Sequence, residues 1–239
     1  MARRYTLRVM KDYSLYRYAE IEKKLDLMGL NFLDILVTGV TGAGKSTTLN
    51  SFFHREVAKV GTGVDPETMK VAPYYLGRNL RFWDTPGLGD SPAADQRHIE
   101  KITRQLQEQY QCGEETYEVI DLVLVILDGS TRDMNTNDIL LNKVLIPHIH
   151  QSRILVAINQ ADFAMKGRHW NAASATPDRE LLAFLEDKAR SIQRRVQKST
   201  GIEIPLPVCY SAKYGYHVDR LFDLMIDNIP NRKRRGRNR

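Results

Sequence analysis

The sequence is poor in cysteine and has no long apolar run. Its 239 residues include two cysteines, Cys112 and Cys209. They are far apart and lack the spacing of metal ligands, so we expect reduced thiols in a cytoplasmic protein. No run of about 18 apolar residues occurs, and no transmembrane segment is therefore predicted. Residues 1–4 lead into no apolar stretch of the kind that a signal peptide contains.

The sequence also has little net charge outside its C-terminal end. The formal net charge is +6, and residues 232–239 contain six basic side chains, so the rest of the chain is close to neutral. We predict a basic, disordered tail over 229–239. Such a tail either contacts RNA or an anionic surface or only keeps the protein in solution. No aromatic residues are interleaved with the basic ones to favour stacking on bases, and both alternatives stay open.

Short apolar segments, typical of buried strands, alternate with amphipathic segments along the chain. The pattern predicts strands over 33–37, 69–76, 80–83, 119–127, 153–158 and 207–210, and helices over 46–53, 95–110, 136–145, 176–199 and 218–228. This alternation predicts an α/β fold of three layers, in which a mostly parallel sheet is covered by helices on both faces.

Several connecting segments are predicted from local composition. Apolar spacings of three and four over 13–28 predict a helix, so residues 1–32 form a helical extension that either packs on the domain or belongs to a partner interface. Residues 112–116 are predicted to be a polar connection and 163–175 a long loop. Thr176 is the predicted N-cap of the next helix, with Pro177 at its first position.

Residues 39–46 fit the phosphate-binding pattern G-x-x-x-x-G-K-[ST] between a predicted strand and a predicted helix. Glycines let the backbone N–H groups turn toward phosphates near the positive end of the helix. Lys45 is predicted to reach the β- and γ-phosphates, and the Ser46 hydroxyl to bind Mg²⁺. The predicted phosphate-binding residues are Gly39, Thr41, Gly42, Ala43, Gly44, Lys45, Ser46 and Thr47.

Three further motifs follow predicted strands. Asp84 and Gly87 begin and end a D-x-x-G sequence, in which the carboxylate orients Mg²⁺ and the glycine N–H contacts the γ-phosphate. Residues 159–162 follow the predicted strand 153–158, and residues 211–213 follow the predicted strand 207–210. Because ligands of parallel sheets bind at the carboxyl ends of the strands, we expect all these motifs to meet at one edge.

In this order, the motifs resemble those of the P-loop GTPases, over about residues 33–228. The run 84–88 looks like the Era-like (TrmE–Era–EngA) branch. The whole run of motifs is most similar to its small, prophage-associated bacterial members, and residues 159–162 and the loop 61–68 support this narrower match. The resemblance implies the P-loop NTPase fold for a G domain over 33–228. It also implies GTP as substrate and Mg²⁺ as cofactor.

The resemblance further implies which residues bind the base. Asp162 would accept hydrogen bonds from the guanine N1–H and exocyclic amine, and Asn159 would bond the far edge of the base and tie the loops together. The Ala212 N–H would face the guanine carbonyl. Gln160, Ser211 and Lys213 complete the implied base site. Adenine offers the wrong pattern to Asp162, so an ATPase is disfavoured.

The chain departs from the family pattern at three positions. Gln160 replaces the usual lysine, whose stem stacks on the base, and the recognition pair stays intact. Gly42 stands where potassium-stimulated relatives carry asparagine, so we expect no potassium stimulation. Leu88 stands where many small GTPases have a glutamine that positions water.

One threonine of the first switch loop is expected to bind Mg²⁺ and to act in catalysis. Thr68 is preferred because it directly precedes a predicted strand, and Thr62 in the glycine-rich loop is the alternative. His98, near the second switch loop, is predicted to be a surface residue without a catalytic role.

These observations predict a GTP-binding protein that hydrolyses GTP to GDP and phosphate with Mg²⁺ as a slow molecular switch. The first alternative is a GTP-loaded assembly module with negligible turnover, which associates with itself or with a partner. The second is a ribosome- or RNA-associated GTPase.

Overall fold

The computed structural model describes residues 11–58, 72–130 and 135–236. Its central feature is a six-stranded sheet in the order β10-β7-β6-β1-β3-β2, which is parallel except for β2 at one edge. The mostly parallel sheet predicted from the sequence is therefore confirmed. The strands are β1 (Leu33–Gly39), β2 (Tyr74–Leu76), β3 (Leu80–Asp84), β6 (Leu122–Asp128), β7 (Ile154–Asn159) and β10 (Val208–Cys209).

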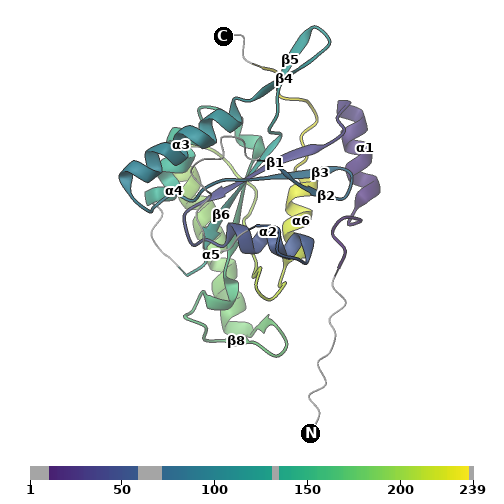
Figure 1. Cartoon of the computed structure of the whole chain (residues 1–239). Coiled ribbons are helices and arrows are strands. Elements are labelled where there is room, and N and C mark those ends of the chain that lie inside the picture. The colour runs from purple at the N-terminus through teal and green to yellow at the C-terminus, as the bar shows by residue number, and fades with distance from the viewer. Residues whose placement is uncertain (1–10, 59–71, 131–134, 237–239) are drawn as a thin grey trace.

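Helices cover both faces of this sheet, which gives the three predicted layers (Figure 1). One face carries α1 (Tyr18–Met28), α2 (Lys45–Phe53) and α6 (Val218–Asp227), and the other carries α3 (Pro92–Leu106), α4 (Asn135–Ile139) with the π-helical η1 (Leu140–Leu145), and α5 (Arg179–Thr200). Alternate side chains of β1 enter the two cores: Ile35 and Val37 face one, and Leu36 faces the other. No helix in the described part of the chain is long and apolar enough to span a membrane.

The segment before α5 differs from its prediction. Thr176–Pro177 is not the helix start but a short strand, β9, which pairs with β8 (Trp170–Asn171) inside the predicted loop. The N-cap is Asp178, whose carboxylate accepts a 3.0 Å hydrogen bond from the Leu181 N–H. A capping side chain two residues downstream therefore moves the start of the helix.

The predicted connection over 112–116 is also wrong. β4 (Gln109–Cys112) and β5 (Glu115–Glu118) form an antiparallel hairpin that projects from the domain (Figure 1). Its turn contains Gly113 at φ 65°, in the left-handed region that glycine adopts without strain. The preceding helix ends at Leu106, before the predicted residue 110.

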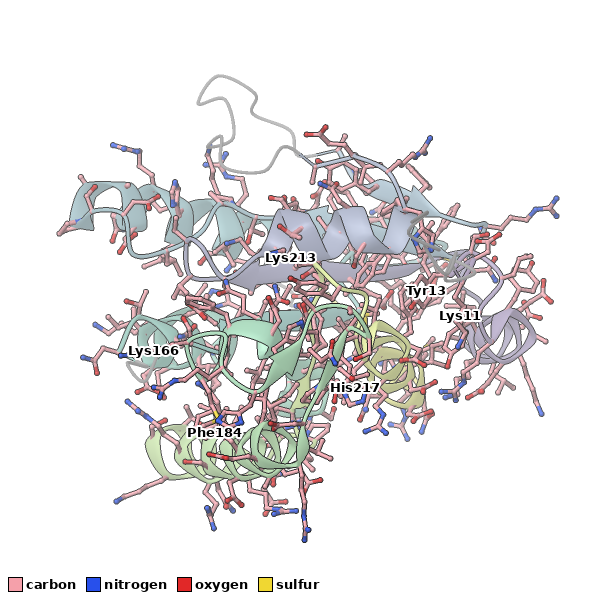
Figure 2. The ribbon with its side chains drawn as sticks, turned by 90° about the horizontal axis from the view of Figure 1, so that it is seen from below. Lys11, Tyr13, Lys166, Phe184, Lys213 and His217 are labelled. Carbon is pink, nitrogen blue, oxygen red and sulfur yellow. The ribbon has the colours of Figure 1, made fainter. Side chains whose placement is uncertain are left out.

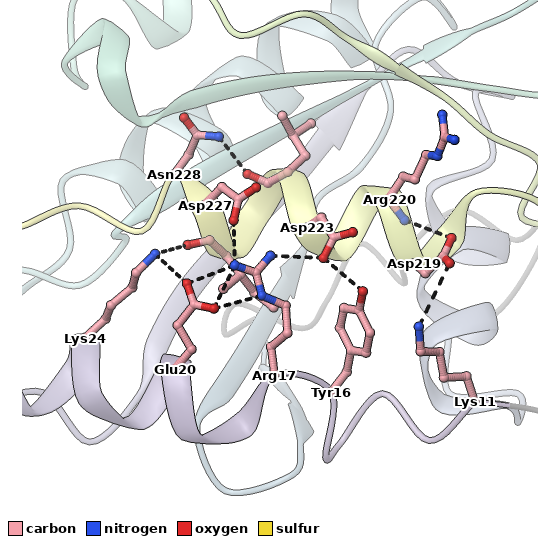
Figure 3. A network of polar contacts seen from close by, with 12 residues as sticks. Lys11, Tyr16, Arg17, Glu20, Lys24, Asp219, Arg220, Asp223, Asp227 and Asn228 are labelled. Carbon is pink, nitrogen blue, oxygen red and sulfur yellow. Dashed lines mark hydrogen bonds and ion pairs between the residues drawn. The ribbon is translucent and has the colours of Figure 1, made fainter.

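The N-terminal extension packs on α6. α1 buries Ile21, Leu25 and Met28, and Figure 3 shows the polar contacts along the same contact surface. The Arg17 guanidinium lies 2.9 Å from the Asp223 carboxylate and 2.6 Å from that of Asp227. Of the two alternatives for this segment, the described residues 11–32 fit packing on the domain.

The predicted disordered tail is wrong for residues 229–236. Arg234 is buried, pairs with Glu118, and donates to the carbonyls of Ile120 at 2.7 Å, Leu106 at 3.0 Å and His148 at 2.9 Å. The Glu118 N–H in turn donates to the Arg234 carbonyl at 2.9 Å. The tail is ordered because a buried cation and its backbone acceptors satisfy one another.

Candidate functional site

The loop between β1 and α2 has the backbone that its glycines allow. Gly39 has φ 146°, and a Cβ there would lie 2.2 Å from the Ile126 carbonyl oxygen. Gly44 has φ 86°, and its Cβ would lie 2.3 Å from Asn159 Nδ2. Larger residues at either position would move the neighbouring strand ends. Of the other predicted phosphate-binding residues, Thr41 and Gly42 are exposed, Ala43 is buried, and Ser46 and Thr47 are half-buried in the first turn of α2.

Lys45 lies under this loop. Its ammonium donates to the carbonyls of Gly39 at 3.2 Å and Val40 at 2.9 Å, and the side chain is buried. Burial lowers the pKa of Lys45, and the Asp84 carboxylate partly offsets this effect. Among the described residues this desolvated ammonium hydrogen-bonds to neutral carbonyls only, and it favours an incoming anion because an anion restores the charge pairing that burial removed.

Asp84 ends β3 next to Val37 of β1. Its Oδ1 is buried and has no hydrogen-bond partner within the described residues. Burial raises the pKa of Asp84 to about 6, and Lys45 acts in the opposite direction. An unpartnered carboxylate oxygen on the strand next to β1, near enough to Lys45 for their charges to interact, suits a hard divalent cation such as Mg²⁺. Thr62 and Thr68, the candidate switch threonines, lie outside the described residues.

The D-x-x-G segment lies against the phosphate loop. A Cβ on Gly87 would be 2.5 Å from Thr41 Oγ1. The Thr41 N–H donates to the Leu88 carbonyl at 2.7 Å, and the Leu88 N–H donates to the Gly39 carbonyl at 3.3 Å. The Leu88 side chain is buried in the core that includes α3. It is therefore a packing residue, and its side chain does not line the site.

Residues of α3 hold the segment after Gly87, and sequence reasoning missed this arrangement. His98 Nδ1 lies 2.6 Å from the Gly87 carbonyl oxygen. Asp95 Oδ1 accepts a 2.7 Å hydrogen bond from the Gly89 N–H. His98 is half-buried rather than a free surface residue. The sequence carried no signal for its contact, because the register of α3 against this loop depends on tertiary packing.

Asn159 joins two loops of the site. Its Nδ2 donates to the Ala43 carbonyl at 3.0 Å, and its Oδ1 accepts from the Ala212 N–H at 3.1 Å. The side chain is buried at the end of β7. One amide therefore fixes the phosphate loop relative to the loop that follows β10.

The remaining residues of the predicted base site surround this amide. Gln160, at φ 60°, donates from Nε2 to the Gly42 carbonyl at 2.8 Å. The Ser211 hydroxyl donates to Asp162 Oδ1 at 2.6 Å, which fixes the orientation of that carboxylate. Lys213, labelled in Figure 2, is exposed on the loop between β10 and α6.

A second contact that the sequence did not predict joins two elements at the same edge of the sheet. The hydroxyls of Thr48 in α2 and Tyr210 after β10 lie 2.7 Å apart and are buried. Thus the structure brings the described members of all four motifs to the carboxyl ends of β1, β3, β7 and β10. No cluster of three or more His, Cys, Asp or Glu side chains suited to a metal occurs among the described residues.

The fold and the phosphate loop define a P-loop nucleoside-triphosphate-binding protein, and comparison with known proteins narrows this class. Residues 34–160 match the family described as "50S ribosome-binding GTPase". This match covers more than half of the chain, so the protein belongs to that family and carries a GTP-binding GTPase domain.

Individual relatives agree with this assignment. GTPase Der of Sulfurimonas denitrificans is 25% identical over 226 residues, which are 91% of this chain and 38% of Der. Translocase of chloroplast 125 of Physcomitrium patens is 49% identical over 76 residues, 30% of this chain and 6% of the translocase. The crystal structure of Arabidopsis thaliana Toc33 with GDP and Mg²⁺ has the same fold, with TM-score 0.62, 16% identity and coverage of 93% and 94% of the two chains. The chain thus spans a small part of the curated relatives it matches.

Proposed function

We propose that this protein binds GTP with Mg²⁺, hydrolyses it slowly to GDP and phosphate, and acts as a molecular switch. The observation that carries the proposal is the pair of hydrogen bonds of Asn159 to the phosphate loop and to the Ala212 loop. They bring the predicted phosphate and base sites to a fixed relative position. The unpartnered oxygen of Asp84 lies at the same edge of the sheet and suits a divalent cation.

In this proposal the phosphates of GTP are bound mainly through electrostatic interactions. Lys45 binds the β- and γ-phosphates, while the N–H groups of the loop 39–47 bind their oxygens. Ser46, Asp84 and Thr68 hold Mg²⁺, which neutralises charge on the phosphates when bound. Gly87 contacts the γ-phosphate through its N–H, so that loss of this phosphate releases the segment that His98 and Asp95 fasten to α3.

The guanine base is recognised through hydrogen bonds. Asp162 pairs with the guanine N1–H and amine, and Ser211 holds its carboxylate for this task. Asn159 contacts the rest of the base edge with the Nδ2 hydrogen that the Ala43 carbonyl does not use, and the Ala212 N–H exchanges its bond to Asn159 Oδ1 for the guanine carbonyl. Gln160 keeps the contact with the Gly42 carbonyl as a neutral side chain, and Lys213 covers the base with its aliphatic stem.

Slow turnover follows from the position of Leu88. Its side chain is packed in the core and has no polar group, so it cannot orient the attacking water. Positioning and charge neutralisation supply nearly all the catalysis in phosphoryl transfer. A partner that orders the switch segments would therefore raise the rate without changing the chemistry of the site.

The partner belongs to this proposal as well. Dimerization is important for the GTPase activity of the chloroplast translocon components Toc33 and Toc159, and Era has been crystallised with 16S ribosomal RNA. These neighbours suggest self-association or RNA for this chain. We also propose that the chain belongs to the Era-like branch, supported by the run 84–88, and to its prophage-associated members, supported by residues 159–162 and the loop 61–68. The two unpaired cysteines fit a cytoplasmic location.

Single-turnover hydrolysis by the purified monomer tests the proposal. We expect a rate on the order of 10⁻⁴ to 10⁻² s⁻¹. The Lys45→Ala variant, prepared in parallel, controls for contaminating nucleotidases. A rate above about 1 s⁻¹ without a partner contradicts the slow switch, and no hydrolysis despite tight GTP binding favours the assembly module. Repeating the assay with ribosomal subunits or RNA tests the partner.

A further inference from the structure

A cavity of about 680 Å³ lies at the edge of the sheet opposite to the GTP site. It is bounded by residues 148–153, which precede β7, and by residues 228–235 of the C-terminal segment. Its lining contains five Lys or Arg side chains, namely Arg153, Arg232, Lys233, Arg234 and Arg235. Within the described residues, Glu118 supplies the one carboxylate of this lining. The cavity is therefore cationic, and Asp121, 4.0 Å from Arg153, is a further carboxylate that pairs with this lining from outside it.

Two of these cations form the walls. Arg234 is committed to Glu118 and to backbone carbonyls. Arg153 is buried, donates to the Asp121 carbonyl at 3.0 Å, and also bonds the Arg232 carbonyl. These contacts fix the C-terminal segment against β6 and β7, so the shape of the cavity is set by the fold.

The other three cations face solvent at the rim. Arg232 is exposed and Lys233 half-exposed, and neither forms an ion pair with a described residue. Arg235 makes one exposed pair with Glu115 at 3.2 Å, a kind of contact that contributes little. The rim thus offers cationic charge that the protein itself leaves uncompensated.

The hairpin β4–β5 adds aromatic side chains to this rim. Lys233 Nζ lies 4.9 Å from the centre of the Tyr117 ring, and the rings of Tyr110 and Tyr117 are 5.9 Å apart. Both tyrosines are half-buried. The C-terminal sequence has no aromatic residue among its basic ones, and the fold supplies two of them from a hairpin distant in sequence.

We propose that this cavity binds the phosphate backbone of single-stranded nucleic acid. Several cations around one hollow suit a chain of phosphates, and the half-buried tyrosine rings beside them can stack on bases without sequence preference. A duplex presents its phosphates on a convex surface and does not enter the hollow. A membrane surface requires apolar anchors on a protruding face, whereas the apolar lining here is Ile229 and Pro230 inside a cavity.

This site is separate from the GTP site because the two lie at opposite ends of the same strands. Binding therefore does not depend on the proposed GTPase function. The Lys45→Ala variant is expected to bind nucleic acid as the wild type does, so failure of one proposal leaves the other testable.

Fluorescence anisotropy with a labelled oligouridylate of about 12 nucleotides tests the proposal on the full chain. Each phosphate neutralised contributes about −0.7 to the slope of log affinity against log salt, so three rim cations give about −2. We expect the affinity of the wild type to fall about 20-fold between about 50 and 200 mM salt. In the double variant Arg232→Ala/Lys233→Ala the fall should be about threefold, with weaker binding throughout.

The matched control is Arg55→Ala/Arg179→Ala, which removes the same charge from two exposed positions outside the cavity. Its binding curve should match that of the wild type, and thermal melting confirms that each variant folds. Equal losses in the two double variants, or no loss in either, would overturn the proposal. Equal affinity for duplex, or binding of vesicles with anionic lipid but not of the oligonucleotide, would also overturn it.

Discussion

Asp34 and Asp84 are two buried carboxylates of one sheet, and their surroundings differ. Asp34 lies near the amino end of β1, where Arg81 Nη2 donates to it at 2.6 Å and Trp83 Nε1 at 2.7 Å. Asp84 lies at the carboxyl end of β3, where its Oδ1 has no partner in the described structure. Burial raises the pKa of both groups. The cost of burying the Asp34 carboxylate is offset by protein donors at the amino end of the sheet. At the carboxyl end the buried Asp84 oxygen is available for a ligand.

The buried cations Arg234 and Lys45 differ between the two ends of the sheet in the same way. Arg234 at the amino end pairs with Glu118 and with three backbone carbonyls. Lys45 at the carboxyl end contacts two carbonyls and has a lowered pKa. We infer that buried charge stabilises the fold at the amino end, whereas at the carboxyl end it is kept for binding. Substitutions at the two ends should therefore separate stability from affinity.

The largest effect is expected from Arg234→Ala. Removing one member of a buried ion pair leaves Glu118 uncompensated, and the free energy of unfolding should fall by about 3–5 kcal/mol. Urea unfolding measures this change, with the exposed neighbour Arg235→Ala as the control. GTP affinity of the folded fraction should not change. A loss of affinity without a loss of stability would reverse the assignment of the two ends.

The next effect concerns the choice of base. GTP should be preferred over ATP by at least about 10³, which corresponds to about 4 kcal/mol, because adenine leaves the Asp162 carboxylate unpaired. Asp162→Asn should move the preference toward xanthosine triphosphate, whose C2 carbonyl accepts from the new amide. Competition binding measures both, with the exposed Asp187→Asn as the control. Equal binding of ATP and GTP by the wild type would contradict the base site.

Lys45→Ala should weaken GTP binding by about 2–5 kcal/mol, through loss of a charge-assisted contact with buried phosphates. The free energy of unfolding without nucleotide should not fall, since the variant removes a desolvated charge. Calorimetry and urea unfolding give the two quantities, with the exposed Lys198→Ala as the control. Unchanged affinity would show that residues 39–46 do not bind phosphate.

The smallest effects have opposite signs at the two carboxylates. The pKa of Asp84 is raised to about 6 in the folded protein, so its ionised form costs stability above that pH. The cost disappears below about pH 4, where the folded and unfolded states are both protonated. Without nucleotide or Mg²⁺, Asp84→Asn should therefore increase the free energy of unfolding at pH 7 by about 1–2 kcal/mol, and by nothing below about pH 4.

Asp34→Asn should lower the same free energy at pH 7 by about 1–2 kcal/mol, because Arg81 loses its charged acceptor. Unfolding curves at several pH values compare the two variants, each the control of the other. A loss of stability in both would mean that Asp84 is held by the protein in the same way as Asp34.

The sheet was predictable because its strands carry their own signal. Leu122–Asp128 is apolar at nearly every position, and a short run of this kind is typical of a parallel strand that is buried on both faces. The phosphate loop was predictable because Gly39 and Gly44 occupy backbone positions that exclude other residues. At both places the physical requirement is local, so a single sequence contains it.

The missed features depend on contacts between distant residues. The hairpin Gln109–Glu118 has two paired tyrosines among polar, mostly exposed residues, so it lacks the apolar run that marks a buried strand. The contact of His98 with Gly87 requires the register of α3 against the loop. The burial of Arg234 requires Glu118 and the carbonyls of two further segments. A basic residue among basic residues gives no indication of such partners.

The contacts of Arg234 also determine when this end of the protein can fold during synthesis. Its guanidinium joins the Leu106 carbonyl across 128 residues of chain and the Ile120 carbonyl across 114. At about 5–20 residues per second, a ribosome needs roughly 6 to 26 s to cover the longer interval. Glu118 lacks its cation from its own synthesis until Arg234 is made, and the phosphate loop, β6 and β7 are all made before Arg234. The opposite end of the sheet therefore closes only after residues 229–236 have been made.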